Sequence, residues 1–556
     1  MSESPATAER ANIAGLLSDF AARHPERAAV RVARGSGARL AFRDLGYGEL
    51  ESRSNRIARG LRERGLDVGD RLCLFVRPGA ELVTLAFAAL KAGAVPVLID
   101  PGMGRRNLLA CVERMKPRAF VGIPLAQALR RVFPAAFRTV ELSVTVGPRW
   151  PWGGSSLAEL LQERDDSPFV EEVAPDREAA ILFTSGSTGP AKGVVYTHGI
   201  FAAQVEALKR LYGFESGEVD AACFPLFALF SPGLELTCVF PELDPSRPAT
   251  CDPARIVAAI RASSATSTFG SPAIWRRVVP WCVERGVRLP SLRRVLIAGA
   301  PVPPALVEGF HRVLEGEADV HTPYGATESL PVTSISGREI LELARRHAGE
   351  AVGTCVGRPA PGMEVALARI DDEIHERWSE GLRAPAGERG EICVRGPVVT
   401  PAYAEDEEAT RLAKIGRGAE LRHRMGDVGT FDAEGRLWFH GRKSERLETA
   451  EGLRLPVPTE VLYDGAPCVH RTALVGVGRP GAQRPVLVIE PERGAMPATA
   501  ARRADFVEGL RRHVAGQRGQ VPVEEFLFHP GFPVDVRHNA KIHRGELRRW
   551  AEEQLA

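Results

Sequence analysis

A loop rich in glycine and hydroxyl side chains follows a short apolar run. Residues 181–183 read Ile-Leu-Phe and lead into Thr184, Ser185, Gly186, Ser187, Thr188, Gly189 and, three residues later, Lys192. Glycines let backbone N–H groups approach phosphate oxygens without a clashing Cβ atom, the hydroxyls add donors, and the lysine adds positive charge. The pattern predicts a phosphate-binding loop between a strand and a helix-like segment. The alternative is a surface loop of Ser and Gly.

The loop does not have the Walker A spacing of P-loop nucleotidases, because Ala191 precedes Lys192 and Gly193 follows it. Lysine itself is a signal here. Of 72 basic residues, the lysines are Lys91, Lys116, Lys192, Lys209, Lys414, Lys443 and Lys541. A lysine in such an arginine-rich chain marks a position that favours a compact ammonium over a planar guanidinium.

Alternating strand and helix patterns run through the first 440 residues and must position this loop. Helical patterns cover 49–63 and 82–92, strand patterns cover 71–75 and 94–99, and the same rhythm recurs at 178–183, 197–212, 294–297 and 304–314. Strand–helix–strand succession at this spacing predicts parallel or mixed sheets with covering helices, an α/β fold.

The pattern changes towards the C-terminus. Shorter β-like runs begin at Gly390, a charged segment covers 441–446, and two strands and a last helix are expected at 472–477, 485–489 and 544–553. This region is long enough for a small α+β domain. The expected organisation is an N-terminal domain at 1–440, a hinge at 441–444 and a mobile C-terminal lid at 445–556.

Composition excludes several classes of protein. The 556 residues carry a net charge of +2, so a nucleic-acid partner is not expected. No uncharged apolar run reaches the roughly 18 residues of a membrane-spanning helix. The polar N-terminus lacks the layout of a signal peptide, so a cytoplasmic protein is expected. The nine cysteines include no CxxC pair, which argues against a disulfide scaffold or a zinc ribbon.

Five motifs give the chain a recognisable pattern. After the loop at 184–193 come Tyr324-Gly325-Ala326-Thr327-Glu328, Gly426-Asp427, Gly441-Arg442 and Asn539-Ala540-Lys541-Ile542. Their order and spacing resemble those of the adenylate-forming superfamily, which contains acyl-CoA synthetases, luciferases and peptide-synthetase adenylation domains. The resemblance covers nearly the whole chain. It implies an enzyme that joins a carboxylic acid to AMP at the expense of ATP.

The resemblance also implies roles for individual residues. Thr184, Ser185, Gly186, Ser187, Thr188, Gly189 and Lys192 would hold the departing phosphates. Thr327 would contact the α-phosphate, Gly325 would be part of the nucleotide site, and Glu328 would hold Mg²⁺. Tyr324 and the segment Gly299, Ala300 and Pro301 would enclose the adenine. Asp427 would bind the two ribose hydroxyls, and Arg442 would reach the ribose or a phosphate and mark the hinge. Lys541 would bridge the carboxylate and the α-phosphate in the transition state, so Lys541, Lys192, Thr327 and Glu328 are the expected catalytic set.

Further segments resemble one branch of the superfamily, the olefin β-lactone synthetases. They are 224–230, 322–323, 423–427, 437–439 and 532–542. This resemblance implies adenylation of a long-chain 2-alkyl-3-hydroxy acid, followed by attack of its own 3-hydroxyl to give a β-lactone. Phe224, Phe227 and Phe230 would line an alkyl pocket or pack in the core, and His538 would be a base or a local hydrogen-bonding residue.

Two other functions stay open at this point. One is a long-chain acyl-CoA or acyl-carrier ligase that uses the same acyl-AMP, and the other is a nucleotide-binding pseudoenzyme. The hinge sequence GRKSERLETAEG departs from the usual pattern of thiol-transferring members. Olefin β-lactone synthetases work beside other enzymes of a hydrocarbon pathway, and some relatives make β-lactone natural products. Both fates of the product are therefore open.

Overall fold

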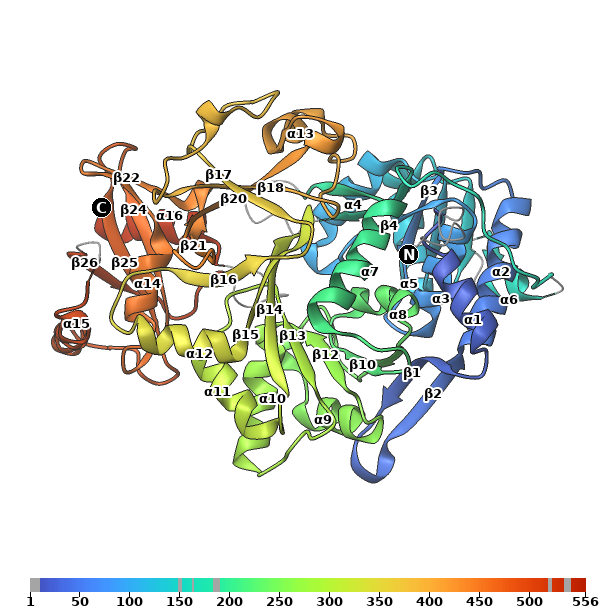
Figure 1. The fold of residues 1–556 in the computed structure, drawn as a ribbon, viewed down its shortest axis with the longest axis horizontal. Helices are drawn as coiled ribbons and strands as arrows, with labels where there is room; N and C mark the ends of the chain where they lie inside the picture. Colours follow the sequence, from blue (N-terminus) through green and yellow to red (C-terminus); the bar gives the residue numbers. More distant parts are fainter. Residues whose placement is uncertain (1–10, 149–152, 163–164, 184–190, 519–522, 535–541) are drawn as a thin grey trace, which may run out of the picture.

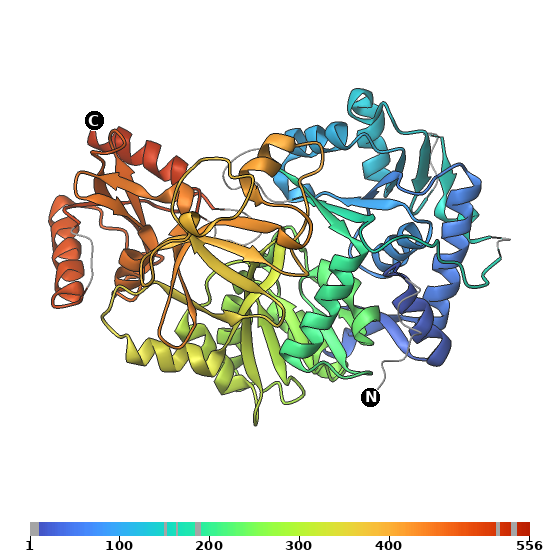
Figure 2. The same ribbon diagram turned by 45° about the horizontal axis from the view of Figure 1, so that its top comes forward.

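Four sheets are present in the computed structural model, which describes residues 11–148, 153–162, 165–183, 191–518, 523–534 and 542–556. Within these ranges the sheets have fourteen, seven, three and two strands. The two large sheets form the main body, and the small ones lie with α14–α16 at one end of the molecule in both views (Figures 1 and 2). The expected α/β class is confirmed.

The seven-stranded sheet carries the strand that precedes the expected phosphate loop. Its order is β7 (Ser155–Ser156), β6 (Leu142–Thr145), β5 (Ala119–Gly122), β3 (Arg71–Phe75), β4 (Val95–Leu98), β8 (Glu178–Phe183) and β9 (Gly193–Thr197). All neighbours are parallel except β8 and β9. Leu72 and Leu74 join one apolar cluster while Cys73 joins another, so the sheet is buried on both faces.

Seven α-helices of the described residues lie in the first 212 positions of the chain. They are α1 (Gly15–Arg23), α2 (Tyr47–Glu63), α3 (Ala80–Lys91), α4 (Arg105–Met115), α5 (Pro124–Val132), α6 (Leu157–Leu161) and α7 (His198–Tyr212). The sequence pattern did not predict β5, β6, β7 or β9. Of these, β9 stands between the loop and α7, antiparallel to β8. The Thr197 hydroxyl caps α7 by accepting the backbone N–H of Ile200, and Gly213 ends it in a left-handed conformation.

The fourteen-stranded sheet joins a parallel part to an antiparallel part. The parallel part is β1 (Ala28–Arg34), β11 (Thr237–Phe240), β10 (Val219–Ala222), β12 (Ser267–Gly270), β13 (Arg294–Ile297) and β14 (Asp319–Ala326), with β2 (Ala41–Gly46) antiparallel at its edge. The antiparallel part is β15 (Ser329–Ser336), β16 (Thr354–Pro359), β21 (Leu437–Arg442), β20 (Arg422–Phe431), β18 (Gly390–Arg395) and β17 (Glu364–Ala368), with β19 (Lys414–Ile415) on β20. The helices of this region are α8 (Ser231–Leu234), α9 (Pro253–Ala262), α10 (Pro272–Glu284), α11 (Pro304–Val313), α12 (Gly337–Arg346) and α13 (Glu407–Ala413).

A separate C-terminal unit follows β21. It contains β22 (Leu447–Thr449), β23 (Gly452–Arg454), α14 (Pro456–Tyr463), β24 (Val469–Val477), β25 (Arg484–Pro491), α15 (Ala500–Val514), β26 (Glu525–Phe528) and α16 (Arg544–Leu555). Its three-stranded sheet has apolar clusters of its own on both faces. Because β21 ends at Arg442, we keep the proposal of a domain boundary at 441–444.

Thr327 and Glu328 are the two residues between β14 and β15. Ala326 pairs with Ser329, so Thr327 and Glu328 form the tip of a tight hairpin. The pairing is irregular between Tyr324 and Ala326, where a Cβ atom on Gly325 would lie 2.5 Å from the Ser329 carbonyl oxygen. Only glycine allows the two strands to approach this closely.

Substitution of Gly325 by Ala should therefore open this hairpin. We expect Gly325→Ala to lower the free energy of unfolding by about 1–3 kcal/mol through overpacking, measured by urea denaturation. Gly509→Ala is the matched control, because no atom lies within 4 Å of a Cβ there and the position is inside α15. A Gly325→Ala protein as stable as the Gly509→Ala protein would contradict the steric argument.

Candidate functional site

The tip of the β14–β15 hairpin is held in place by neighbouring segments. The Tyr196 hydroxyl on β9 donates to the carbonyl oxygen of Thr327 at 2.6 Å. The backbone N–H and the hydroxyl of Thr400 both donate to the carbonyl oxygen of Glu328 at 2.9 Å. The Tyr403 hydroxyl donates to Oε1 of Glu328 at 2.5 Å. The Thr327 hydroxyl and Oε2 of Glu328 take part in none of these bonds, so both can meet a ligand.

Cations gather around Glu328. The Lys192 ammonium lies 4.9 Å from the centre of the Tyr403 ring. Lys414 on β19 is buried, and its ammonium lies 3.3 Å from the Thr400 hydroxyl. Burial lowers the pKa of Lys414 to about 7, although the nearby Glu328 carboxylate acts in the opposite direction. Lys192 lines the cavity at this hairpin, whereas Lys414 lies behind it and bonds to Thr400.

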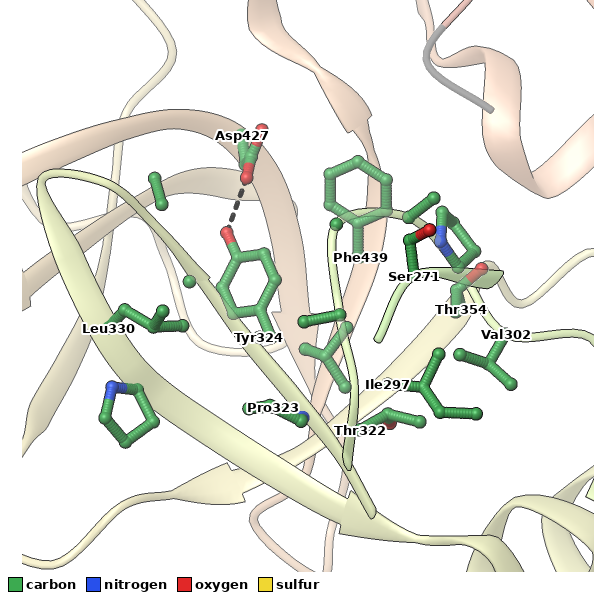
Figure 3. A pocket seen from close by; sticks show the side chains of 18 of the residues that line it. Ser271, Ile297, Val302, Thr322, Pro323, Tyr324, Leu330, Thr354, Asp427 and Phe439 are labelled. Carbon is green, nitrogen blue, oxygen red and sulfur yellow. Dashed lines mark hydrogen bonds between the residues drawn. The ribbon is translucent and has the colours of Figure 1, made fainter. Parts of the chain in front are cut away.

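A second polar centre lies at Asp427 on β20. Its Oδ2 accepts from the Tyr324 hydroxyl at 2.6 Å (Figure 3). Its Oδ1 accepts from the Arg442 guanidinium at 2.7 Å. Burial, followed by the Asp427 charge, raises the pKa of Tyr324 well above its usual range, so the phenol stays neutral. The Asp427 charge also raises the pKa of Arg442. Each carboxylate oxygen keeps a lone pair for a further donor.

One cavity of about 2140 Å³ connects these groups. Among the expected site residues, it is lined by Lys192, Gly299, Ala300, Pro301, Tyr324, Gly325, Thr327, Glu328, Asp427 and Arg442. Tyr324 lies below Asp427 and Phe439 to the right of it (Figure 3), and the two ring centres are 6.4 Å apart. The structure therefore brings together residues from five separate stretches of sequence.

The same cavity has an apolar region. Phe224, Phe227 and Phe230 line it, together with Leu16 of α1, Phe87 of α3 and Phe201 of α7. Phe227 is also part of an apolar core cluster, and its ring centre lies 4.9 Å from that of Phe269. Phe227 therefore both lines the cavity and packs in the core. A ligand with a charged head and an apolar tail fits such a cavity.

Other expected site residues lie outside the described ranges. They are Thr184, Ser185, Gly186, Ser187, Thr188 and Gly189 of the loop, together with His538 and Lys541. The described residues Ile542 and Arg544 line the cavity. Arg544 donates to Glu445 at 2.9 Å and to Oε2 of Glu460 at 2.8 Å, which joins α16 to the segment after β21 and to α14.

Sequence reasoning missed the residues that support the hairpin tip: Tyr196, Thr400, Tyr403 and Lys414. Residue rarity was a usable signal for three of them. The chain has only six tyrosines and seven lysines. Tyr196, Tyr324 and Tyr403 all donate to the hairpin or to Asp427. Thr400 carried no comparable signal, because its role depends on two backbone segments that meet only in the fold.

The pKa of Lys414 gives a stability prediction. Between pH 7 and the ordinary lysine pKa of about 10.4, the unfolded chain binds a proton that the folded chain does not. Lys414 therefore makes stability rise with pH in this window, by at most about 1.4 kcal/mol per pH unit. We expect Lys414→Met to remove this contribution, measured as the difference between wild-type and variant unfolding free energies at pH 7, 8, 9 and 10.

Lys116 offers the control, because its side chain is exposed. Lys116→Met should leave the pH dependence of stability as it is in the wild type. An unchanged pH dependence in Lys414→Met would contradict the burial argument.

Comparison with known proteins agrees with this geometry. Residues 17–404 match the family model described as AMP-binding enzyme. The chain is 46% identical to an olefin β-lactone synthetase of Xanthomonas campestris and 45% identical to one of Stenotrophomonas maltophilia, over 98% of this chain and of each relative. Among solved structures, ATP-bound MatB from Rhodopseudomonas palustris superposes with a TM-score of 0.78 at 22% identity, over 98% of this chain and all of that one.

A second solved structure, the anthranilate CoA ligase AuaEII with anthranoyl-AMP, gives a TM-score of 0.79 at 19% identity and covers 98% of each chain. No helix in the described part of this chain is both long and apolar enough to cross a membrane. The match over 17–404 and the two full-length relatives identify the family. The chain belongs to the AMP-binding enzyme family and is an AMP-forming ligase-type enzyme.

Proposed function

We propose that this enzyme uses ATP to adenylate a long-chain 2-alkyl-3-hydroxy acid and then closes the acyl-AMP to a β-lactone. The observation that carries this proposal is the 46% identity to an olefin β-lactone synthetase over 98% of both chains. The cavity supports it, since charged groups at the hairpin and an apolar region share one space. Because the 3-hydroxyl of the same acid attacks in the second step, no second nucleophile has to enter the site.

In the first step, an oxygen of the acid's carboxylate bonds to the α-phosphorus of ATP and pyrophosphate leaves. Both reactants are anions, so the site must supply positive charge and oriented donors. We assign Lys192 and the loop Thr184–Gly189 to the departing phosphates, Thr327 to the α-phosphate, and Lys541 to the bridge between carboxylate and phosphate. Tyr324 and residues 299–301 would enclose the adenine, and Asp427 and Arg442 would hold the ribose.

In the second step, the 3-hydroxyl oxygen bonds to the acyl carbon. The bond from that carbon to the phosphate oxygen breaks, AMP leaves with the electron pair, and the hydroxyl proton passes to solvent. The enzyme must hold hydroxyl and carbonyl together and keep water away, because water hydrolyses an acyl-AMP. Phe224, Phe227 and Phe230 would hold alkyl chains and help to exclude water.

Glu328 fits the magnesium ion that this chemistry uses. In the described part of the chain, no cluster of three or more His, Cys, Asp or Glu side chains could hold a metal by itself. Mg²⁺ commonly takes one or two protein carboxylates and completes its shell with phosphate oxygens and water. Glu328 lines the cavity, and its Oε1 accepts from Tyr403 while Oε2 takes no part in that bond. Bound there, Mg²⁺ would neutralise phosphate charge.

The function is tested by incubating the enzyme with ATP, Mg²⁺ and a 2-alkyl-3-hydroxy acid in the absence of coenzyme A. We expect equal amounts of AMP and a neutral β-lactone, measured by chromatography and mass spectrometry.

The second candidate is a long-chain acyl-CoA ligase, favoured by 28% identity over 81% of this chain to such an enzyme from Thermus thermophilus. Turnover that strictly requires coenzyme A and gives a thioester would favour this candidate and contradict lactone synthesis.

The role assigned to Lys541 is tested by Lys541→Ala. Loss of an ammonium that acts in the transition state should lower adenylation by about 10²–10³-fold while ATP binding stays within about twofold. Exchange of labelled pyrophosphate into ATP measures adenylation, and calorimetry measures binding. Lys209→Ala, on α7, is the matched lysine control and should retain full exchange. Equal exchange rates in the two variants would remove Lys541 from the mechanism.

A further inference from the structure

One face of α7 turns towards the apolar region of the cavity. The residues of α7 that line the cavity are Phe201, Gln204, Val205 and Leu208, at the three- and four-residue spacing of a single helix face. Three of these four side chains are apolar. Gln204 is only 4% exposed, so its amide is buried in this wall. A polar group at such a place needs a partner, because its burial otherwise destabilises the fold.

The orientation of the Gln204 amide is fixed. Its Nε2 donates to the carbonyl oxygen of Leu330 on β15 at 2.8 Å. A carbonyl oxygen can only accept, so the nitrogen and not the oxygen of the amide must face Leu330. Gln204 also contacts the Tyr196 hydroxyl and lowers the pKa of that phenol, against the larger effect of burial. The hydroxyl of Tyr196 in turn donates to the carbonyl oxygen of Thr327.

The other end of this amide lacks a partner. Oε1 of Gln204 is buried and makes no hydrogen bond to any of the described residues. A buried carbonyl oxygen without a donor costs about 1–3 kcal/mol. The oxygen is therefore a ready acceptor in an apolar wall, and one tyrosine separates its amide from the hairpin residue assigned to the α-phosphate.

We propose that Oε1 of Gln204 accepts a hydrogen bond from the 3-hydroxyl of the bound acid and so makes the enzyme selective for 3-hydroxy acids. This proposal rests on the proposed function. The 3-carbon is two bonds from the carboxyl carbon, so its hydroxyl must lie close to the group that holds the acyl phosphate. Gln204 meets this requirement, because Tyr196 contacts both its amide and Thr327.

The hydrogen bond also suits ring closure. A hydroxyl that donates its hydrogen to Oε1 keeps its oxygen lone pairs free to bond to the acyl carbon. Gln204 takes no proton and is a positioning residue, not a base. An acid without the hydroxyl leaves the amide oxygen unpaired, and sites built around a substrate hydroxyl reject such analogues strongly.

The test compares two acids that differ only in the 3-hydroxyl, in wild type and in Gln204→Met. Pyrophosphate exchange into ATP gives kcat/KM for each acid. We expect the wild type to prefer the hydroxy acid at least tenfold, about 1.4 kcal/mol. We expect Gln204→Met to lose this preference and to keep its exchange with the deoxy acid within about threefold, which also shows that the variant is folded. A preference in Gln204→Met equal to that of the wild type, or a wild type that does not discriminate, would overturn the proposal.

Two further measurements distinguish a positioning role of Gln204 from a purely structural one. Val205→Ala, on the same face of α7, removes apolar contact without touching the amide, so both acids should be affected equally and their ratio should not change. Gln204→Met should also form less lactone per AMP released, because an unpositioned acyl-AMP is hydrolysed. If neither acid supports exchange in the wild type, the proposed function fails and this proposal fails with it. If the wild type supports pyrophosphate exchange but forms no lactone, only the proposed ring closure is contradicted. The preference for the hydroxy acid in wild type and Gln204→Met then still tests the role of Gln204.

Discussion

The hydrogen bonds that hold the tip of the β14–β15 hairpin are the interaction on which the site depends. A two-residue turn has little backbone structure of its own. Here Tyr196 holds one of its carbonyl oxygens, Thr400 holds the other, and Tyr403 holds the Glu328 side chain. Two segments far apart in sequence, one with Tyr196 and one with Thr400 and Tyr403, therefore fix Thr327 and Glu328. A reaction between two anions needs groups that are positioned before the charge develops.

These contacts place polar groups in a poorly solvated region, where each must be satisfied. Phenols serve well for this purpose, because burial raises the pKa values of Tyr196, Tyr324 and Tyr403 and keeps them as neutral donors. The Lys414 amine, which lies 3.3 Å from the Thr400 hydroxyl, also interacts electrostatically with Glu328. Low dielectric strengthens such interactions and also makes an unpaired group costly. Gln204 is notable for this reason, since one of its two polar atoms has a partner and the other has none among the described residues.

Much of the fold follows from the periodicity of the sequence. The helix expected at 49–63 is α2 (Tyr47–Glu63), the strand at 71–75 is β3, and the last helix at 544–553 is α16 (Arg544–Leu555). The strand β9 was not predicted, because a five-residue apolar run after a loop does not differ in pattern from the start of a helix. The motifs led to Tyr324, Asp427 and Arg442, which the structure joins in one hydrogen-bonded group. The supporting residues were not predictable in this way. Thr400 and Gln204 act through backbone carbonyls of distant segments, and no local spacing encodes such a contact.

The central claim is that the nucleotide is held between the hairpin tip and Asp427 while the alkyl chains lie against α7. A crystal structure with a sulfamoyl-adenosine analogue of the acyl-AMP tests this most directly. The account predicts the sulfamate within hydrogen-bond distance of Thr327, the ribose hydroxyls on Asp427, and the acyl chain beside Phe227 and Gln204. A ribose bound away from Asp427, or an acyl chain that leaves the cavity without contacting α7, would contradict the account.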